Sequence, residues 1–330
     1  MRILIAAVVA AGMLYIARLN SQGRPEFISR QEHGFTFEMT TVPKAPEDDS
    51  VRIEVRIVGQ VDRNLRAMFR ASKPLQTEKT NLRLYSNTPL QVVDSAGDLY
   101  AARAATGTRG GRLLYYFEIR DQTGGQRARF TQPDGRPFEV RFIGHIPPLV
   151  LITHVGLMAL TVFFVVMAAI SAVGVVRGVI SVRSMAIHAA LAAICAFFGG
   201  YPIGMAMNHY AFNTIWEGVP FGTDATDNKT QLLFAYLLFV SLASVGSVTN
   251  NKFGKDLFSP QVLGWFGIGT FALMFGIYLI PHSSQFGPGL TTIVCYAFLG
   301  ALALLLLVRV LQTRLAAAKA EKSARASKRP

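Results

Sequence analysis

The sequence predicts an α+β membrane protein with an N-terminal signal-anchor helix, an outward antiparallel β-sandwich of the immunoglobulin-like class, and a five-helix transmembrane bundle. Two observations carry this prediction. First, 51% of the 330 residues are hydrophobic and only 16% are charged, which lies outside the usual composition of soluble globular proteins. Second, long uncharged intervals flank one charge-dense segment whose hydrophobic residues recur with a period of two.

Uncharged intervals place the helices. A transmembrane helix needs about 20 predominantly apolar residues, and the longest uncharged interval, residues 257–308, can hold two helices with a break at Pro281. The predicted helices are residues 3–18, 148–176, 185–207, 231–249, 262–281 and 289–310. The last five form the predicted transmembrane domain, residues 147–312. Pro202 and the preceding glycine pair predict a kink in the third helix.

The first helix has two interpretations. Its apolar stretch, residues 3–16, is about as long as the hydrophobic region of a signal peptide. No small-residue cleavage site follows before Arg18, so we favour an uncleaved signal anchor over residues 1–20. A cleaved signal peptide remains the alternative.

Residues 25–146 form the charge-dense segment, which we expect to be the β-sandwich. Between Val51 and Val58 apolar and charged residues alternate, so that Arg52, Glu54 and Arg56 share one face of a strand. Further strands are predicted at residues 34–42, 64–71, 81–85, 90–94, 112–120, 126–131 and 137–144. Short strands separated by turns that contain Gly or Pro are typical of an antiparallel sandwich.

Basic residues in short loops predict the orientation, because Lys and Arg resist translocation across a membrane. They occur in two short turns and in the tail, residues 313–330, whereas the alternate loops, 208–230 and 282–288, hold only Lys229. The basic side is therefore expected to be cytoplasmic, with both termini inside and residues 25–146 outside. A basic tail beside a membrane favours contact with anionic lipids and not with nucleic acid.

The loop at residues 208–230 concentrates polar residues in a helical part that is otherwise almost free of ionisable groups. It contains Glu217, Asp224, Asp227 and Asn228, whose oxygen atoms could bind Ca²⁺ or complete a mixed histidine and carboxylate metal site. The alternative is structural. Asp227 and Asn228 would cap a helix that begins near Thr230, and the glycines and proline of the loop would shape a tight turn.

Three histidines are expected at one depth of the membrane. Under the predicted topology, His154, His209 and His282 lie near the outer ends of three helices. Met158 follows His154 by four residues and Met205 precedes His209 by four, so each pair shares a helix face. Two His and two Met suit copper, and two facing His suit haem b. Ordinary packing of His and Met is the alternative.

Several other classes of function lack support. A blue-copper domain needs a Cys with two His, whereas Cys195 and Cys295, the two cysteines, fall inside predicted helices, where we expect small buried side chains. An ion-coupled transporter usually keeps a charged group within the bundle, and none is predicted there. The sequence also lacks a Walker loop, a nucleophile elbow and a zinc-protease helix.

Two motifs carry a resemblance to a family. Trp216-Glu-Gly-Val-Pro-Phe-Gly-Thr-Asp-Ala-Thr-Asp-Asn-Lys229 and Ile280-Pro-His-Ser283 resemble motifs of an uncharacterised family of bacterial polytopic membrane proteins. The resemblance extends to residues 138–145 and His154. It implies a location in the bacterial cell envelope and a shared site at the outer face. Together with the predicted orientation, this places the chain in the bacterial inner membrane with residues 25–146 in the periplasm. The resemblance implies nothing about a reaction.

Two functions follow as expectations. The first is a subunit of an envelope complex that binds copper or haem b at the outer membrane interface and serves in electron transfer or metal handling. His154, His209 and His282 would be its ligands, with Met158, Met205, Asp224 and Asp227 as further metal ligands. The second is a non-catalytic assembly subunit whose sandwich and basic tail dock partner proteins.

Overall fold

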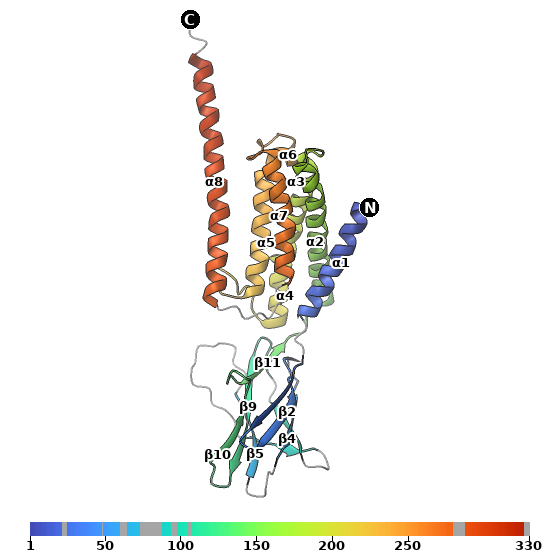
Figure 1. Cartoon of the computed structure of the whole chain (residues 1–330), viewed down its shortest axis with the longest axis vertical. Helices are drawn as coiled ribbons and strands as arrows, with labels where there is room; N and C mark the ends of the chain where they lie inside the picture. Colours follow the sequence, from blue (N-terminus) through green and yellow to red (C-terminus); the bar gives the residue numbers. More distant parts are fainter. Residues whose placement is uncertain are drawn as a thin grey trace. The chain divides into compact units, whose positions relative to one another are not determined.

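The computed structural model describes residues 1–21, 25–47, 49–59, 65–72, 88–93, 98–104, 107–279 and 288–326. Its fold is α+β and contains two compact units (Figure 1). The helical unit comprises Met1–Gln22, Pro148–Met207 and Ile215–Pro330. The two-sheet unit comprises Gly23–Pro147 together with Asn208–Thr214.

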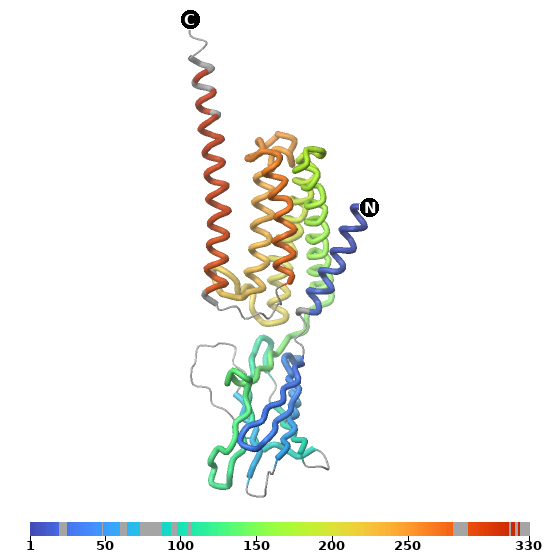
Figure 2. The backbone as a smooth tube through the Cα atoms, in the orientation of Figure 1, coloured from blue at the N-terminus to red at the C-terminus, as the bar shows by residue number. Residues whose placement is uncertain are grey.

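Most of the helices belong entirely to the helical unit. The described helices are α1 (Arg2–Ser21), α2 (Pro148–Val176), α3 (Val182–Gly200), α4 (Pro202–Phe212), α5 (Ala225–Ala243), α6 (Val245–Thr249), α7 (Pro260–Leu279) and α8 (Pro288–Ala326). Only α4 continues beyond this unit, because its last residues, from Asn208 on, belong to the two-sheet unit. The axes of α2, α3, α5 and α7 run nearly parallel and form the bundle (Figure 2).

Five helical stretches are long and apolar enough to cross a membrane. Within the described residues these are Arg2–Leu19, Pro148–Val176, Val182–Phe212, Pro260–Leu279 and Leu290–Ala320. They correspond to five of the six predicted spans. The sixth prediction, residues 231–249, fails as one long apolar helix, because the chain divides at Ser244 into α5 and α6 and the first turn of α5 is polar.

The third predicted helix is interrupted at Tyr201, close to the predicted kink. Helix α3 ends at Gly200 and α4 begins at Pro202, the first helical position, where the missing N–H of proline costs no hydrogen bond. Tyr201 joins the two helices: its N–H donates to the Phe197 carbonyl over 2.9 Å, and its own carbonyl accepts from the Met205 N–H over 2.7 Å.

Small residues allow α7 to approach α2 closely. A Cβ atom at Gly264 of α7 would lie 2.7 Å from Val176 Cγ2, 3.1 Å from the Val176 nitrogen and 3.2 Å from the Ala172 oxygen. Ala168, Ala172 and Ala189, all fully buried, continue this close packing among α2, α3 and α7. Cys195 and Cys295 are both buried free thiols, as predicted.

The basic segments of the helical unit gather at one end of the bundle. Arg183, in the first turn of α3, donates to Asn250 Oδ1 in the α6–α7 connection over 2.9 Å. The guanidinium of Arg309 in α8 lies 4.6 Å from the centre of the Phe258 ring in the same connection. Lys252 and Lys255 belong to this connection as well. Three segments far apart in the sequence therefore present their positive charges at the same end.

The two-sheet unit contains all of the described strands. They are β1 (Phe27–Glu32), β2 (Phe35–Thr40), β3 (Lys44–Pro46), β4 (Val51–Val58), β5 (Leu65–Ala71), β6 (Thr88–Pro89), β7 (Gln91–Val92), β8 (Leu99–Ala104), β9 (Arg112–Asp121), β10 (Gln126–Phe130) and β11 (Phe138–Ile143). The first sheet has the order β1-β2-β4-β8-β7, and the second has the order β3-β11-β9-β5-β6, with β10 also paired to β9.

One strand pair departs from the predicted antiparallel arrangement. Strand β3 pairs with β11 in parallel, whereas the other described pairs are antiparallel. The reason is that the chain leaves β2, which lies between β1 and β4 in the first sheet, and enters the second sheet at its edge as β3. There it meets β11 in the same direction.

The alternation predicted for residues 51–58 is confirmed, because successive residues of β4 are buried and exposed in turn. Other predicted strands correspond to β2, β5, β7, β9, β10 and β11. The prediction at 81–85 lies outside the described residues. Strands β1, β3, β6 and β8 were not predicted; β8, with three alanines, has little of the β-branched and aromatic character that marks strands.

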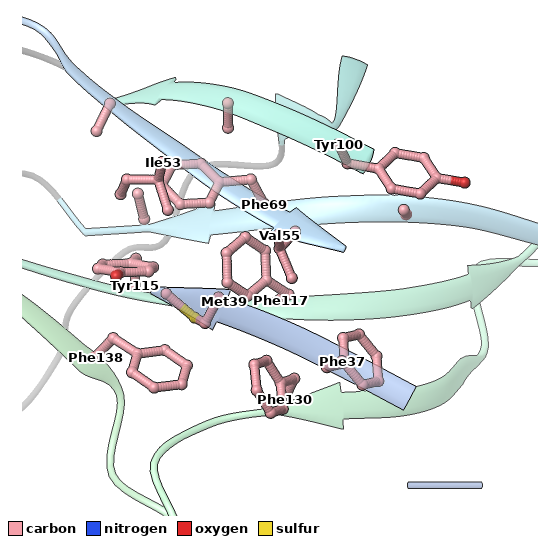
Figure 3. Close-up of a cluster of buried hydrophobic side chains, with 14 of the residues drawn as sticks. Phe37, Met39, Ile53, Val55, Phe69, Tyr100, Tyr115, Phe117, Phe130 and Phe138 are labelled. Carbon is pink, nitrogen blue, oxygen red and sulfur yellow. The ribbon is translucent and has the colours of Figure 1, made fainter. Parts of the chain in front are cut away.

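An aromatic core joins the two sheets (Figure 3). The ring of Phe37 in the first sheet stacks on that of Phe130 in the second, with ring centres 4.7 Å apart and planes 10° from parallel. Phe69, Phe117 and Tyr115 extend the same cluster. Burying one such side chain contributes about 1.5–3 kcal/mol, so the unit has a substantial core although its chain segments contain no cysteine.

Candidate functional site

The first turn of α5 buries three consecutive polar residues. Asp227, Asn228 and Lys229 are 7%, 1% and 8% exposed. Successive residues of an α-helix point about 100° apart, so burying all three requires cover on most sides of this turn. The loop at residues 215–224 and the neighbouring helices provide that cover, and together they form the candidate site.

Two side chains of this turn hold the loop in place. Asp227 Oδ2 accepts a hydrogen bond from the Glu217 N–H over 2.7 Å, and Asn228 Oδ1 accepts one from the Val219 N–H over 2.7 Å. Gly218, between them, has no room for a side chain, since a Cβ atom would lie 2.8 Å from Asp227 Cβ. The three consecutive loop residues are therefore fitted closely against the helix.

Asp224 caps the helix. Its Oδ1 accepts hydrogen bonds from the Thr226 N–H over 2.8 Å and from the Asp227 N–H over 3.0 Å, which satisfies two of the free donors at the helix start. The prediction that Asp227 and Asn228 cap a helix beginning near Thr230 is wrong. The helix begins at Ala225, one residue after Asp224, so Asp227 and Asn228 lie inside it and bind the loop instead.

Aromatic rings cover the site. Trp216 of the loop stacks on Tyr201, with ring centres 5.1 Å apart and planes 14° from parallel. The indole N–H of Trp216 donates to the Val219 carbonyl over 3.2 Å, so this hydrogen bond joins two residues of the same loop. Tyr201 also meets Phe234 of α5 edge to face at 5.3 Å. The break between α3 and α4 thus places Tyr201 over the candidate site.

Burial also changes the acidity of the lysine in this site. Lys229 lies in the first turns of α5, outside the five stretches that are apolar enough to cross a membrane, and desolvation lowers its pKa to about 8, while the nearby charge of Asp224 opposes part of that change. The side-chain amide nitrogen Nδ2 of Asn228 is buried without a hydrogen-bond partner in the described part of the chain. The site therefore combines a weakly basic amine with a buried amide donor.

His154 and Met158 face the α3–α4 break from α2. His154 Nδ1 lies 3.0 Å from the Gly199 carbonyl oxygen. A Cβ atom at Gly199 would lie 3.2 Å from Met158 Sδ. The predicted sharing of one helix face by His154 and Met158 is confirmed, because both side chains point toward Gly199.

The remaining predicted ligands are distributed differently. His209 belongs to the two-sheet unit, where its ring packs on Tyr210 at 5.8 Å. Met205 is in the helical unit, in α4, and His282 lies outside the described residues. In the described ranges, no three His, Cys, Asp or Glu side chains are grouped in a way that could hold a metal ion.

The end of α4 docks within the two-sheet unit. The Gly144 N–H donates to the Ala211 carbonyl over 3.0 Å, and the Arg141 guanidinium lies 3.8 Å from the centre of the Phe212 ring. A Cβ atom at Gly144 would lie 3.1 Å from the Arg109 side chain. We expected residues 208–214 to be part of one polar loop with Asp224 and Asp227. They instead pack within the two-sheet unit.

Sequence reasoning missed the roles of Tyr201, Lys229 and the Asn228 side chain. The sequence signal was the run of three consecutive polar residues in the first turns of α5, because successive residues of a helix point in different directions and are all buried only where other segments cover them.

No family model matches the chain, and no curated protein matches it.

Proposed function

We propose that the chain is a multi-pass membrane protein that acts as a non-catalytic docking subunit. The helical unit anchors it in the bacterial inner membrane, and the two-sheet unit is presented in the periplasm to partner proteins. One observation carries this proposal: the loop groups that could have served chemistry hold the loop to α5. Asp224, Asp227 and Asn228 each accept backbone N–H groups.

The distribution of charge supports the orientation. Positive residues in short connections mark the cytoplasmic side of a membrane protein, and Arg183, Lys252 and Arg309 belong to segments that meet at one end of the bundle. That end is proposed to be cytoplasmic. The two-sheet unit follows α1 and precedes α2, whose Pro148 end is the opposite one, and is therefore proposed to be periplasmic.

The length of α8 supports contact with lipid headgroups. Its 39 residues extend over about 58 Å, whereas the hydrocarbon core of a membrane is about 30 Å thick. The basic portion from Arg309 onward would leave the membrane on the cytoplasmic side. There Arg314 and Lys319 would meet the negative surface potential of anionic lipids.

Replacing Asp227 by Ala should destabilise the helical unit by about 1–3 kcal/mol, because the Glu217 N–H loses its acceptor. Asp227→Asn is the matched control, since its side-chain oxygen still accepts this hydrogen bond, and it should lose less stability. Thermal unfolding of the two purified proteins in detergent provides the comparison. An Asp227→Ala protein as stable as the wild type would contradict a structural role for this carboxylate.

Docking itself is tested on native membranes. Mild extraction followed by native mass spectrometry should show the chain in a complex of fixed stoichiometry with another envelope protein. Without residues 25–146 the complex should no longer form, while the helical unit remains in the membrane. A chain that is extracted alone under all mild conditions would overturn the docking function.

A metal or haem b function is the second candidate, and the geometry of His154 favours it. A carbonyl bound to one ring nitrogen fixes the imidazole and leaves the other nitrogen free to ligate, as in many metal sites. Met158 would add a soft donor. We propose electron transfer or metal handling for this arrangement of His154 and Met158.

Optical and elemental analysis of the purified protein tests this second candidate. His154→Ala should remove a bound copper or a Soret band, whereas His188→Ala should leave either signal unchanged, because His188 packs on Phe164 elsewhere in the bundle. Wild-type protein from cells supplied with copper and haem that contains neither at stoichiometric level would exclude the candidate.

A further inference from the structure

The outward face of the second sheet carries a cluster of arginines. Arg66 and Arg70 of β5, Arg120 of β9 and Arg129 of β10 surround Glu118, and we refer to the four as the arginine face. Arg66 and Arg129 are exposed, while Glu118 is 3% exposed.

Strand register places these residues on one side of the sheet. Arg66 is directly opposite Arg120. Arg129 is directly opposite Glu118. The intervening residues Phe69, Phe117 and Phe130 point into the aromatic core. Since side chains alternate between the two faces of a strand, the arginines point away from the core.

The arginine face has an excess of positive charge. Glu118 accepts from Arg120 Nε over 2.8 Å and lies 3.7 Å from Arg70 Nε. Among the residues that the structure describes, no carboxylate forms an ion pair with Arg66 or Arg129. Like charges directly opposite each other on a sheet are destabilising, so the Arg66–Arg120 pair opposes folding and would be relieved by an anionic partner.

The outward face of the first sheet is balanced. Arg52 pairs with Glu54 over 2.7 Å, and Arg56 pairs with Asp98 over 3.4 Å. Arg103, exposed and directly opposite Arg52, is the comparable residue on that face. The two faces therefore differ in charge although both are rich in arginine.

The composition of the arginine face resembles that of protein interfaces, which are enriched in Arg, Tyr and Met and depleted in Lys. The guanidinium of Arg129 lies 4.1 Å from the centre of the Tyr116 ring. Met68 is directly opposite Glu118. Guanidinium groups also bind carboxylates through two parallel hydrogen bonds, which an ammonium group cannot do.

We propose that the arginine face binds an acidic segment of a partner protein. This inference rests on the proposed docking function and adds its surface and the chemistry of its partner. Neighbouring strands are about 4.8 Å apart and residues two positions apart about 7 Å, so the four arginines spread over roughly 10 by 13 Å. Several carboxylates of one short acidic segment can reach them together.

The test measures binding of a fluorescein-labelled oligoglutamate peptide to the full chain in detergent, by fluorescence anisotropy. Arg66→Glu should weaken binding at least about tenfold, because it replaces attraction by repulsion. Arg103→Glu is the matched control: like Arg66, Arg103 is exposed and lies directly opposite another arginine, and the substitution changes the charge by the same amount. It should change the affinity for the peptide less than twofold. Wild-type binding should also weaken as NaCl is raised.

The remaining outcomes overturn the proposal. The first is that the wild type does not bind the peptide, and the second is that both variants lose the same amount of affinity for it. The third is that Arg66→Glu still binds the peptide as the wild type does but no longer binds vesicles of phosphatidylglycerol. The last result would assign the face to a membrane surface. The melting temperatures of both variants are measured to check that each protein is folded. The complex in native membranes is measured in a separate experiment. If that complex is intact but the peptide does not bind the arginine face, the docking function stands and another surface of the protein serves it.

Discussion

A leucine in place of Gly264 should prevent α7 from packing against α2 and destabilise the helical unit by at least about 3 kcal/mol. Even the first side-chain carbon would lie 3.1 Å from the Val176 nitrogen and 3.2 Å from the Ala172 oxygen. Backbone atoms inside a helix cannot rotate away as a side chain can. The two helices must therefore separate, which also exposes the buried alanines between them.

Gly276 of the same helix provides the control for this prediction. A Cβ atom there meets nothing within 4 Å, and leucine has a higher helix propensity than glycine. Gly276→Leu should therefore be neutral or slightly stabilising. Size-exclusion profiles and thermal unfolding in detergent distinguish the two variants. Equal behaviour of Gly264→Leu and Gly276→Leu would mean that the close α2–α7 contact does not determine stability.

Features with a local signal could be predicted from the sequence. Helix α2 begins at Pro148 and ends at Val176, the predicted bounds, because an uncharged run ends at Arg177. The alternation from Val51 to Val58 similarly specified β4 and its buried face. In both cases the polarity of each residue indicates whether its side chain is buried or exposed, and no contact with a distant part of the chain is needed for the prediction.

Features that depend on contacts between distant residues could not be predicted. Asp224, Asp227 and Asn228 are all suitable caps by residue type, and only the position of the loop residues Glu217 and Val219 decides which of them binds where. The same limit applies to strand β3, whose three residues have no strand pattern of their own and are ordered by pairing with β11. The spacing of Met205 and His209 along one helix likewise could not show that His209 belongs to the two-sheet unit.

Replacing Glu118 by Ala should destabilise the two-sheet unit by about 3 kcal/mol, because removing one member of a buried ion pair leaves the other charge without compensation. The Glu118 side chain is 3% exposed, and its partners Arg70 and Arg120 are 16% and 30% exposed. Their partial access to solvent keeps the effect at the lower end of the range for buried pairs. Thermal unfolding of the full chain measures the change.

Glu54→Ala is the matched control. Glu54 also points outward from a central strand and pairs with an arginine two residues away, Arg52, over 2.7 Å. Its side chain, however, is 47% exposed, and an exposed pair contributes about 0–1 kcal/mol. A clear difference between the two variants would show that burial of Glu118, and not ion pairing as such, determines the effect.

The same substitution separates a structural role for Glu118 from its role at the arginine face. Glu118 is the internal carboxylate of that face, so it competes with any carboxylate of a partner for Arg120 and Arg70. Glu118→Ala should therefore bind the oligoglutamate peptide more tightly than the wild type although the protein is less stable. A destabilised variant whose peptide affinity is unchanged or weaker would show that the arginines are occupied in holding the fold and do not receive an acidic partner.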